Sequence, residues 1–338
     1  MGYQMKTTLC VVCALLYSIS VYAHDYISLL SAAGPYEVNV INYESAPFSN
    51  HVYTKPLKQR FTETGLHNER IFKNALTVFY PETDIKQPLI IISHGWGDSK
   101  ESQMSLAQYL ASHGYAAATF SGDSCIYPEH FLAAIKEAHA LLRQAAQDPQ
   151  SHLYNKIDMQ HTAVIGHSMG GTAALHYALE NTAVKAVIAL NPYNGGLKLI
   201  ELVGGTNSVL GSDIANLKSP ALIITGTHDN LAHPEKTFAF CKNWNQYTPL
   251  AFFAIKGGKH AHGIDRIGND YTGTFDAQKH SLYRAIVFSW LELYIRHNTL
   301  PASYLFLNSH SLEQLKPFLH SSDESRYPPL LLQNLYSN

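Results

Sequence analysis

The residues Gly166-His167-Ser168-Met169-Gly170 carry the clearest chemical signal in the chain. They match the pattern Gly-X-Ser-X-Gly, which is weak evidence by itself. Here the pattern follows an apolar run over 162–166 and precedes an Ala-rich segment over 170–181. A tight turn between a strand and a helix would lift a serine hydroxyl above the sheet, with glycines leaving room for the close approach. We therefore predict that Ser168 is a nucleophile.

A serine nucleophile needs a histidine base, and the base needs an acid that orients it. Where a serine occupies a strand-to-helix turn of this kind, the chain order is serine, acid, histidine. Asp229 follows the apolar run 221–225, and His260 follows the run 250–255 after a Gly-Gly turn. We predict that Asp229 is the acid and His260 the base.

Two neighbouring residues compete for these roles. His262 lies two residues beyond His260, and Asp265 comes after both histidines, out of the expected order. The pair His260 and His262 also suggests a metal ligand set. However, the sequence shows no third cluster of ligands and no His-Glu-X-X-His motif, so we predict neither a metal nor another cofactor.

The segment His94-Gly95-Trp96-Gly97 follows the apolar run Leu89–Ser93. A glycine-containing loop after such a strand supplies one backbone donor to an oxyanion, and the residue after the nucleophile supplies the other. We assign these donors as the backbone N–H groups of Trp96 and Met169. A plain β-turn is the alternative interpretation of the loop.

The elements that must position these residues alternate along the chain. We expect strands at residues 75–80, 89–93, 115–120, 162–166, 184–190, 221–225 and 250–255, and helices at 102–113, 129–147, 170–181, 234–244 and 275–296. Such alternation predicts an α/β fold with a mostly parallel central sheet and helices on both faces. In such sheets, ligands bind at the carboxyl ends of the strands.

With these motifs in place, the chain resembles the α/β-hydrolases of the dienelactone hydrolase and cutinase-like group. The bacterial polyesterase–lipase–cutinase and platelet-activating-factor-acetylhydrolase-like enzymes are similar to it. The matching stretches include HGWGDSK, HLYNKIDMQHTAVIGHSMGG, ALNPYN, LIITGTHDNLAHP and KGGKH, and they span about residues 70–296.

The resemblance implies an α/β-hydrolase fold and a serine ester hydrolase that forms an acyl-enzyme. Its motif places the triad at Ser168, Asp229 and His260. It further implies substrate binding by Trp96 as an aromatic clamp, by Tyr193 as a second aromatic wall, and by His167 beside the nucleophile. The implied substrate is a small-molecule, lipid or polyester ester, with transient contact to a lipid interface.

Several alternatives remain open at this stage. The same triad fits a peptidase, a thioesterase or a lactonase, and a silent hydrolase fold fits a binding protein. The Gly-rich insertion 193–219 fits a lid and equally a rigid surface excursion. The disulfide typical of the cutinase-like enzymes is not matched by Cys125 and Cys241, which fit one bridge or two buried thiols.

The chain has 338 residues and a net charge of −2 without a long basic run, which argues against a nucleic-acid partner.

Residues 1–23 combine Lys6, an apolar segment and a cleavage site ending at Ala23, and this pattern predicts a signal peptide and a secreted or periplasmic protein. We expect the catalytic domain at 24–299 and a C-terminal extension packed on it at 300–338. The sequence leaves the oligomeric state open.

Overall fold

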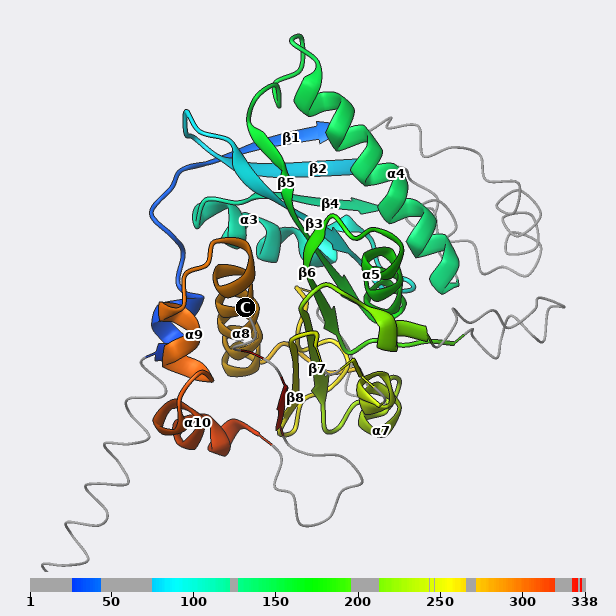
Figure 1. Cartoon of the computed structure of the whole chain (residues 1–338), viewed down its shortest axis with the longest axis vertical. Helices are drawn as coiled ribbons and strands as arrows, with labels where there is room; N and C mark the ends of the chain where they lie inside the picture. Colours follow the sequence, from blue (N-terminus) through cyan, green and yellow to red (C-terminus); the bar gives the residue numbers. More distant parts are fainter. Residues whose placement is uncertain are drawn as a thin grey trace, which may run out of the picture.

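The computed structural model describes residues 26–43, 75–121, 127–195, 213–242, 244–245, 247–265, 272–319, 330–333 and 335. Within these residues nine strands form one sheet in the order β1-β2-β4-β3-β5-β6-β7-β8-β9 (Figure 1). The strands are β1 (Val38–Tyr43), β2 (Ala75–Pro81), β3 (Gln87–Ser93), β4 (Ala116–Ser121), β5 (Ile157–His167), β6 (Val184–Leu190), β7 (Ala221–Gly226), β8 (Leu250–Ile255) and β9 (Leu330–Gln333).

The strands from β4 to β8 in this order are all parallel, and β1, β2 and β9 are antiparallel to their neighbours. The predicted mostly parallel sheet is therefore confirmed. A helical segment covers residues 26–31. The helices that follow it are α3 (Met104–Ser112), α4 (Pro128–Gln147), α5 (Met169–Glu180), α7 (Pro234–Phe238), α8 (Ala277–Ile295), α9 (Leu300–Leu305) and α10 (Ser309–Leu315).

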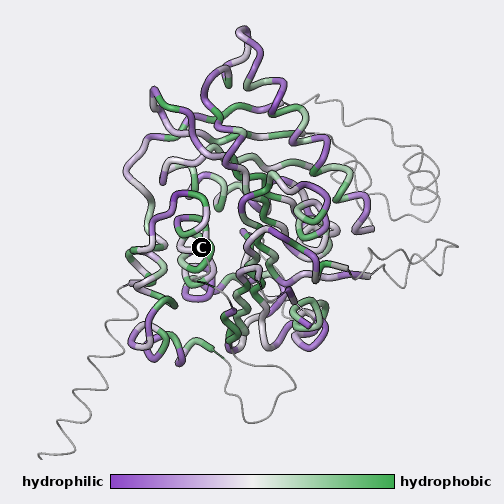
Figure 2. Tube along the Cα trace, in the orientation of Figure 1, coloured by the Kyte–Doolittle hydropathy of each residue, from purple (hydrophilic) through white to green (hydrophobic). Residues whose placement is uncertain are grey.

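The continuous apolar runs of the central strands arise because both faces of the sheet are covered. In β3, Leu89 and Ile91 belong to the core shared with α4 and α5, whereas Ile90 and Ile92 belong to the core shared with α3 and α8. The colouring of Figure 2 agrees, since the hydrophobic segments concentrate along the central strands. This two-layered burial holds the carboxyl ends of the parallel strands rigidly side by side.

The observed elements differ from the predicted ones mainly at their ends. The helix expected at 102–113 begins at Met104 after a 3₁₀ turn, and the helix expected at 234–244 ends at Phe238 and continues as the 3₁₀ turn Ala239–Cys241. The edge strands β1 and β9 were not predicted. No helix in the described ranges is long and apolar enough to cross a bilayer.

The described residues after 299 lie against the α/β body. Ala302, Leu305 and Phe306 are buried in the same core as Trp290 of α8, and β9 pairs with β8. The predicted signal peptide 1–23, Cys125 and most of the insertion 193–219 lie outside the described residues. Cys241 is buried, and no described residue forms a disulfide with it.

Candidate active site

Ser168 occupies the single position between β5 and α5, as a nucleophile at a strand-to-helix turn must. Its backbone has φ 55° and ψ −124°, a conformation that residues other than glycine rarely adopt. The turn is held by four backbone hydrogen bonds, of which two join it to the end of β6 and the loop after it. The Ser168 N–H donates to Leu190 O (3.0 Å), and the Ser168 carbonyl accepts from Tyr193 (3.0 Å), Gly171 (3.0 Å) and Thr172 (3.2 Å). A strained backbone that its surroundings fix in this way is typical of a functional residue.

The glycines around Ser168 are required by the closeness of the backbones. A Cβ on Gly166 would lie 2.0 Å from the Gly170 carbonyl oxygen, and a Cβ on Gly170 would lie 2.2 Å from the His94 carbonyl oxygen. Both neighbours are main-chain atoms, which cannot move aside as a flexible side chain could. The pattern Gly-X-Ser-X-Gly therefore brings β5, α5 and the loop after β3 into direct contact.

Asp229 and His260 form a buried pair at the ends of the adjacent strands β7 and β8. His260 Nδ1 lies 2.7 Å from Asp229 Oδ2. An ionised carboxylate only accepts hydrogen bonds, so the Nδ1 atom carries the proton and Nε2 is left as an acceptor. This is the tautomer that a general base requires.

Two glycines allow the loops of the acid and the base to touch. A Cβ on Gly226, at the end of β7, would lie 2.4 Å from the carbonyl carbon of Gly258. The His228 N–H donates to the Gly258 carbonyl at 2.8 Å. The two loops are thus joined through their backbones directly beside the Asp229–His260 pair.

Asp229 accepts four hydrogen bonds. The backbone N–H groups of Leu231 (2.9 Å) and Ala232 (2.8 Å) donate to Oδ1, while His260 and the amide of Asn191 (2.6 Å) donate to Oδ2. Burial raises the pKa of Asp229, but these hydrogen bonds outweigh burial and hold the pKa below its usual value. Asp229 is therefore ionised at neutral pH.

His167 connects Ser168 to His260. Its Nε2 lies 2.8 Å from the carbonyl oxygen of His260, and the two rings are 4.7 Å apart. A Cβ on Gly95 would lie 2.8 Å from the Ser168 Cβ and 3.0 Å from His167 Nδ1. Ser168, His260 and the loop after β3 therefore meet at His167, which is itself buried.

The two expected oxyanion donors are Met169, which directly follows Ser168, and Trp96, which directly follows the Gly95 that approaches Ser168. Met169 is the first residue of α5, and the N–H of a first helical residue has no acceptor within its helix. Trp96 lies in the turn closed by the hydrogen bond from the Asp98 N–H to Gly95 O (3.2 Å), and 37% of it is exposed. Burial lowers the pKa of the preceding His94 to about 4, so this ring stays neutral.

His262 and Asp265, the alternative candidates for the base and the acid, have other hydrogen-bond partners. His262 Nδ1 accepts from the backbone N–H of Lys259 at 3.0 Å, within its own loop. Asp265 Oδ2 accepts from the Ser105 N–H at 2.6 Å, and its other oxygen lies 3.1 Å from His280 Nε2. Asp265 thus caps the start of α3 and ties it to α8, apart from the Asp229–His260 pair.

Tyr193 is half-buried beside the turn at Ser168, and its ring contacts Gly195.

Asn191 and Tyr283 lie near the Asp229–His260 pair, and we did not predict either of them as a site residue from the sequence. The Tyr283 hydroxyl donates to Asn191 Oδ1 at 3.0 Å. Two signals for Asn191 were available: its position directly after a buried strand, and its place in the stretch ALNPYN. In the described ranges no group of three or more His, Cys, Asp or Glu side chains is placed to hold a metal.

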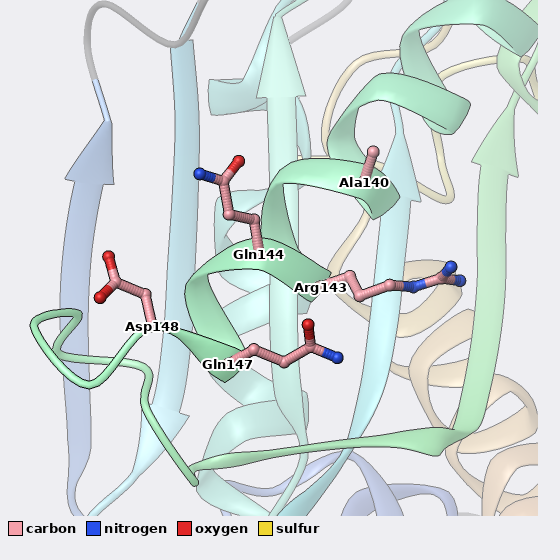
Figure 3. A pocket seen from close by; sticks show the side chains of 5 residues that line it. All are labelled: Ala140, Arg143, Gln144, Gln147 and Asp148. Atoms are coloured by element: carbon pink, nitrogen blue, oxygen red, sulfur yellow. The ribbon is translucent and has the colours of Figure 1, made fainter.

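A hollow on α4 is separate from this site. It is lined by Ala140, Arg143, Gln144, Gln147 and Asp148 (Figure 3). These residues belong to the carboxyl-terminal half of α4 and the residue after it, which leads to the beginning of β5. Ser168 follows the carboxyl end of β5, so the hollow lies toward the amino ends of the parallel strands.

A strained serine between a strand and a helix, a buried Asp–His pair and a parallel sheet covered on both faces define an α/β-hydrolase. The family described as PET hydrolase-like matches residues 72–316. This chain belongs to that family, and it is an enzyme that hydrolyses ester bonds.

Curated relatives agree with this assignment. The chain is 27% identical over 236 residues to "Cutinase est2" of Thermobifida alba, covering 68% of this chain and 70% of the relative. It is 24% identical over 282 residues to "Cutinase cut1" of Thermobifida fusca, covering 81% and 76%. It is also 27% identical over 152 residues to "Quorum-quenching protein AidA" of Acinetobacter baumannii (strain MDR-ZJ06), covering 44% and 47%.

Proposed function

We propose that this chain is a secreted serine hydrolase of carboxylic esters that acts through Ser168, His260 and Asp229. The observation that carries the proposal is the buried Asp229–His260 hydrogen bond of 2.7 Å beside the strained turn at Ser168. Export is proposed from residues 1–23, with cleavage after Ala23.

The reaction proceeds in two steps. Ser168 Oγ attacks the ester carbonyl carbon while His260 Nε2 takes the hydroxyl proton, and Asp229 stabilises the imidazolium that forms. The backbone N–H groups of Trp96 and Met169 stabilise the oxyanion of the tetrahedral intermediate. The proton passes from His260 to the leaving alcohol, and an acyl-enzyme remains. A water molecule deprotonated by His260 then releases the acid and restores Ser168.

The substrate class is proposed to be an apolar ester, such as a polyester or a lipid. Two exposed apolar side chains support this proposal: Trp96 on the oxyanion loop and Leu231, two residues after the acid. Transient contact with a lipid interface follows from the same side chains. The named cutinase relatives are in accord with a polymeric ester.

A lactone is the second candidate substrate. Because a lactone is a cyclic ester, the same triad and the same oxyanion donors would open it. A comparison of acyl esters of rising chain length with simple lactones separates the two candidates.

The decisive test compares two histidines of one loop. We expect His260→Asn and Ser168→Ala to lower kcat/KM for a p-nitrophenyl acyl ester by at least about 10³-fold. His262→Asn is the matched control and should keep most of the activity. A fluorophosphonate probe should label the wild type and the control but not Ser168→Ala. Full esterase activity in Ser168→Ala would overturn the proposal.

A further inference from the structure

We propose that Asn191 and Tyr283 are positioning residues that hold the carboxylate of Asp229 toward His260. The Tyr283 hydroxyl orients the Asn191 amide, and the amide fixes Asp229 Oδ2 in the direction of the base. This inference rests on the proposed function, because it assigns a role behind the acid of the proposed triad.

The three side chains form a continuous buried chain of hydrogen bonds. The Asn191 amide lies 2.6 Å from Asp229 Oδ2, and the Tyr283 hydroxyl lies 3.0 Å from Asn191 Oδ1. Each of the three residues is at most 1% exposed. Water therefore has no access with which to replace a lost partner, and each hydrogen bond contributes more than it would at the surface.

The chemistry of the three side chains decides which atom donates and which accepts in each hydrogen bond. Because a carboxylate has no proton, it must be faced by the NH₂ group of Asn191, which leaves Oδ1 for the tyrosine hydroxyl. Burial and the charge of Asp229 raise the pKa of Tyr283, so its hydroxyl keeps the proton that it donates. Asp229 Oδ2 thus receives one hydrogen bond from the base and one from the amide, which together set the plane of the carboxylate.

The backbone of Asn191 anchors the amide. Its φ is 46°, in the left-handed region that asparagine tolerates better than most residues, and its N–H donates to Ile224 O at 2.7 Å. Tyr283 also touches the base loop, because a Cβ on Gly263 would lie 2.6 Å from its ring. The hydrogen bonds from Tyr283 through Asn191 to Asp229 are called the relay below. The relay joins β6, α8, the acid loop and the base loop at one point.

Asn191→Gly is the sharpest single variant, because glycine accepts the left-handed backbone and removes only the amide. We expect kcat/KM for a p-nitrophenyl ester to fall about 10- to 100-fold, mainly through kcat, since the amide contacts the acid and no substrate. A purely structural role for Asn191 would lower the melting temperature and leave the kcat of the folded enzyme unchanged.

Asn191→Asp adds a readout in pH. It places two carboxylates in contact, and repulsion favours a state in which they share one proton. The protonated partner then donates to Asp229 as the amide does. The groups that face this pair are His260, Tyr283 and the N–H groups of Leu231 and Ala232. The activity of the variant relative to the wild type should rise as pH falls from about 9 to about 6.

Tyr283→Phe tests the outer link, and Tyr177→Phe is its matched control. Tyr177 is also buried and accepts from an asparagine, Asn181 Nδ2, at 2.9 Å, but at the end of α5 away from Asp229. We expect Tyr283→Phe to lower kcat by about 3- to 10-fold and Tyr177→Phe to leave it unchanged. In the Asn191→Gly background, Tyr283→Phe should add less than about twofold, because its partner is already absent.

The outcomes separate the two proposals. If Ser168→Ala keeps full activity, the proposed function fails and the relay has no triad to serve. If Ser168→Ala is inactive while Asn191→Gly keeps the wild-type kcat, the relay is wrong and the proposed function stands. A pH-independent activity ratio for Asn191→Asp, or full additivity of Asn191→Gly and Tyr283→Phe, would also overturn the relay.

Discussion

Asp229→Asn probes the proposed triad most sharply, because the hydrogen bonds around this residue decide where the new amide must point. On the Oδ1 side, the amide NH₂ would face the backbone N–H groups of Leu231 and Ala232, which cannot become acceptors. On the Oδ2 side it would face two groups that can both become acceptors. The His260 ring can change its tautomer, and the Asn191 amide can turn its oxygen toward the new amide and donate its NH₂ group to the Tyr283 hydroxyl instead. The NH₂ group of the variant therefore points toward His260.

The consequence for His260 is specific. Its Nδ1 then accepts from the amide, and its proton moves to Nε2, the atom that must take the proton of Ser168. The geometry stays almost unchanged while the base is lost. We expect kcat to fall about 10⁴-fold, which is about 5.5 kcal/mol of transition-state stabilisation.

The assay is hydrolysis of a p-nitrophenyl ester by the folded variant, with fluorophosphonate labelling of Ser168 as a second measure of nucleophile activation. Asp265→Asn is the matched control, since Asp265 is a partly buried carboxylate with a histidine partner of its own. It should retain kcat within about threefold. A kcat for Asp229→Asn within about tenfold of the wild type would refute the reasoning.

Two further predictions concern the framework of the site. Gly170→Ala places a Cβ 2.2 Å from the His94 carbonyl oxygen, so we expect a stability loss of about 1–3 kcal/mol in urea melts, together with reduced labelling of Ser168. Asp276 caps α8 by accepting from the Lys279 N–H at 3.0 Å, and Asp276→Ala should cost about 1 kcal/mol at neutral pH. Burial raises the pKa of Asp276, but the bonds to Lys279 outweigh it and keep the pKa low. The stability difference from the wild type is therefore complete above the unfolded pKa of about 4 and should vanish in thermal melts as pH falls through the folded pKa.

The fold was predictable where the signal is local. The strands expected at 184–190 and 250–255 are observed with those bounds, because both are apolar and buried at every position except Lys185. The edge strand β1 was missed because its residues are half-buried or exposed and include two asparagines, which strands disfavour. β9 was missed because it has only four residues and its partner, β8, is distant in sequence.

The candidate site shows the same contrast between residues with a local sequence signal and residues without one. Ser168, Asp229 and His260 each follow a strand that the sequence indicates. The topology alone therefore predicts that all three lie at the carboxyl ends of the parallel strands. Asn191 and Tyr283 are 92 positions apart, and their hydrogen bond has no local signature. Whether a polar residue after a strand faces solvent or another side chain depends on packing that a single sequence does not encode.

The pairing of β9 with β8 has a consequence for solubility. β8 leads directly into the base loop, and its outer edge is covered by Leu330–Gln333 along Leu250–Phe253. A chain shortened before Leu330 would present an unpaired row of backbone N–H and C=O groups along a strand of apolar residues. Such an edge is a template for pairing with a second molecule. Truncated forms of this enzyme should therefore self-associate through β8, even though every residue of the proposed triad is still present.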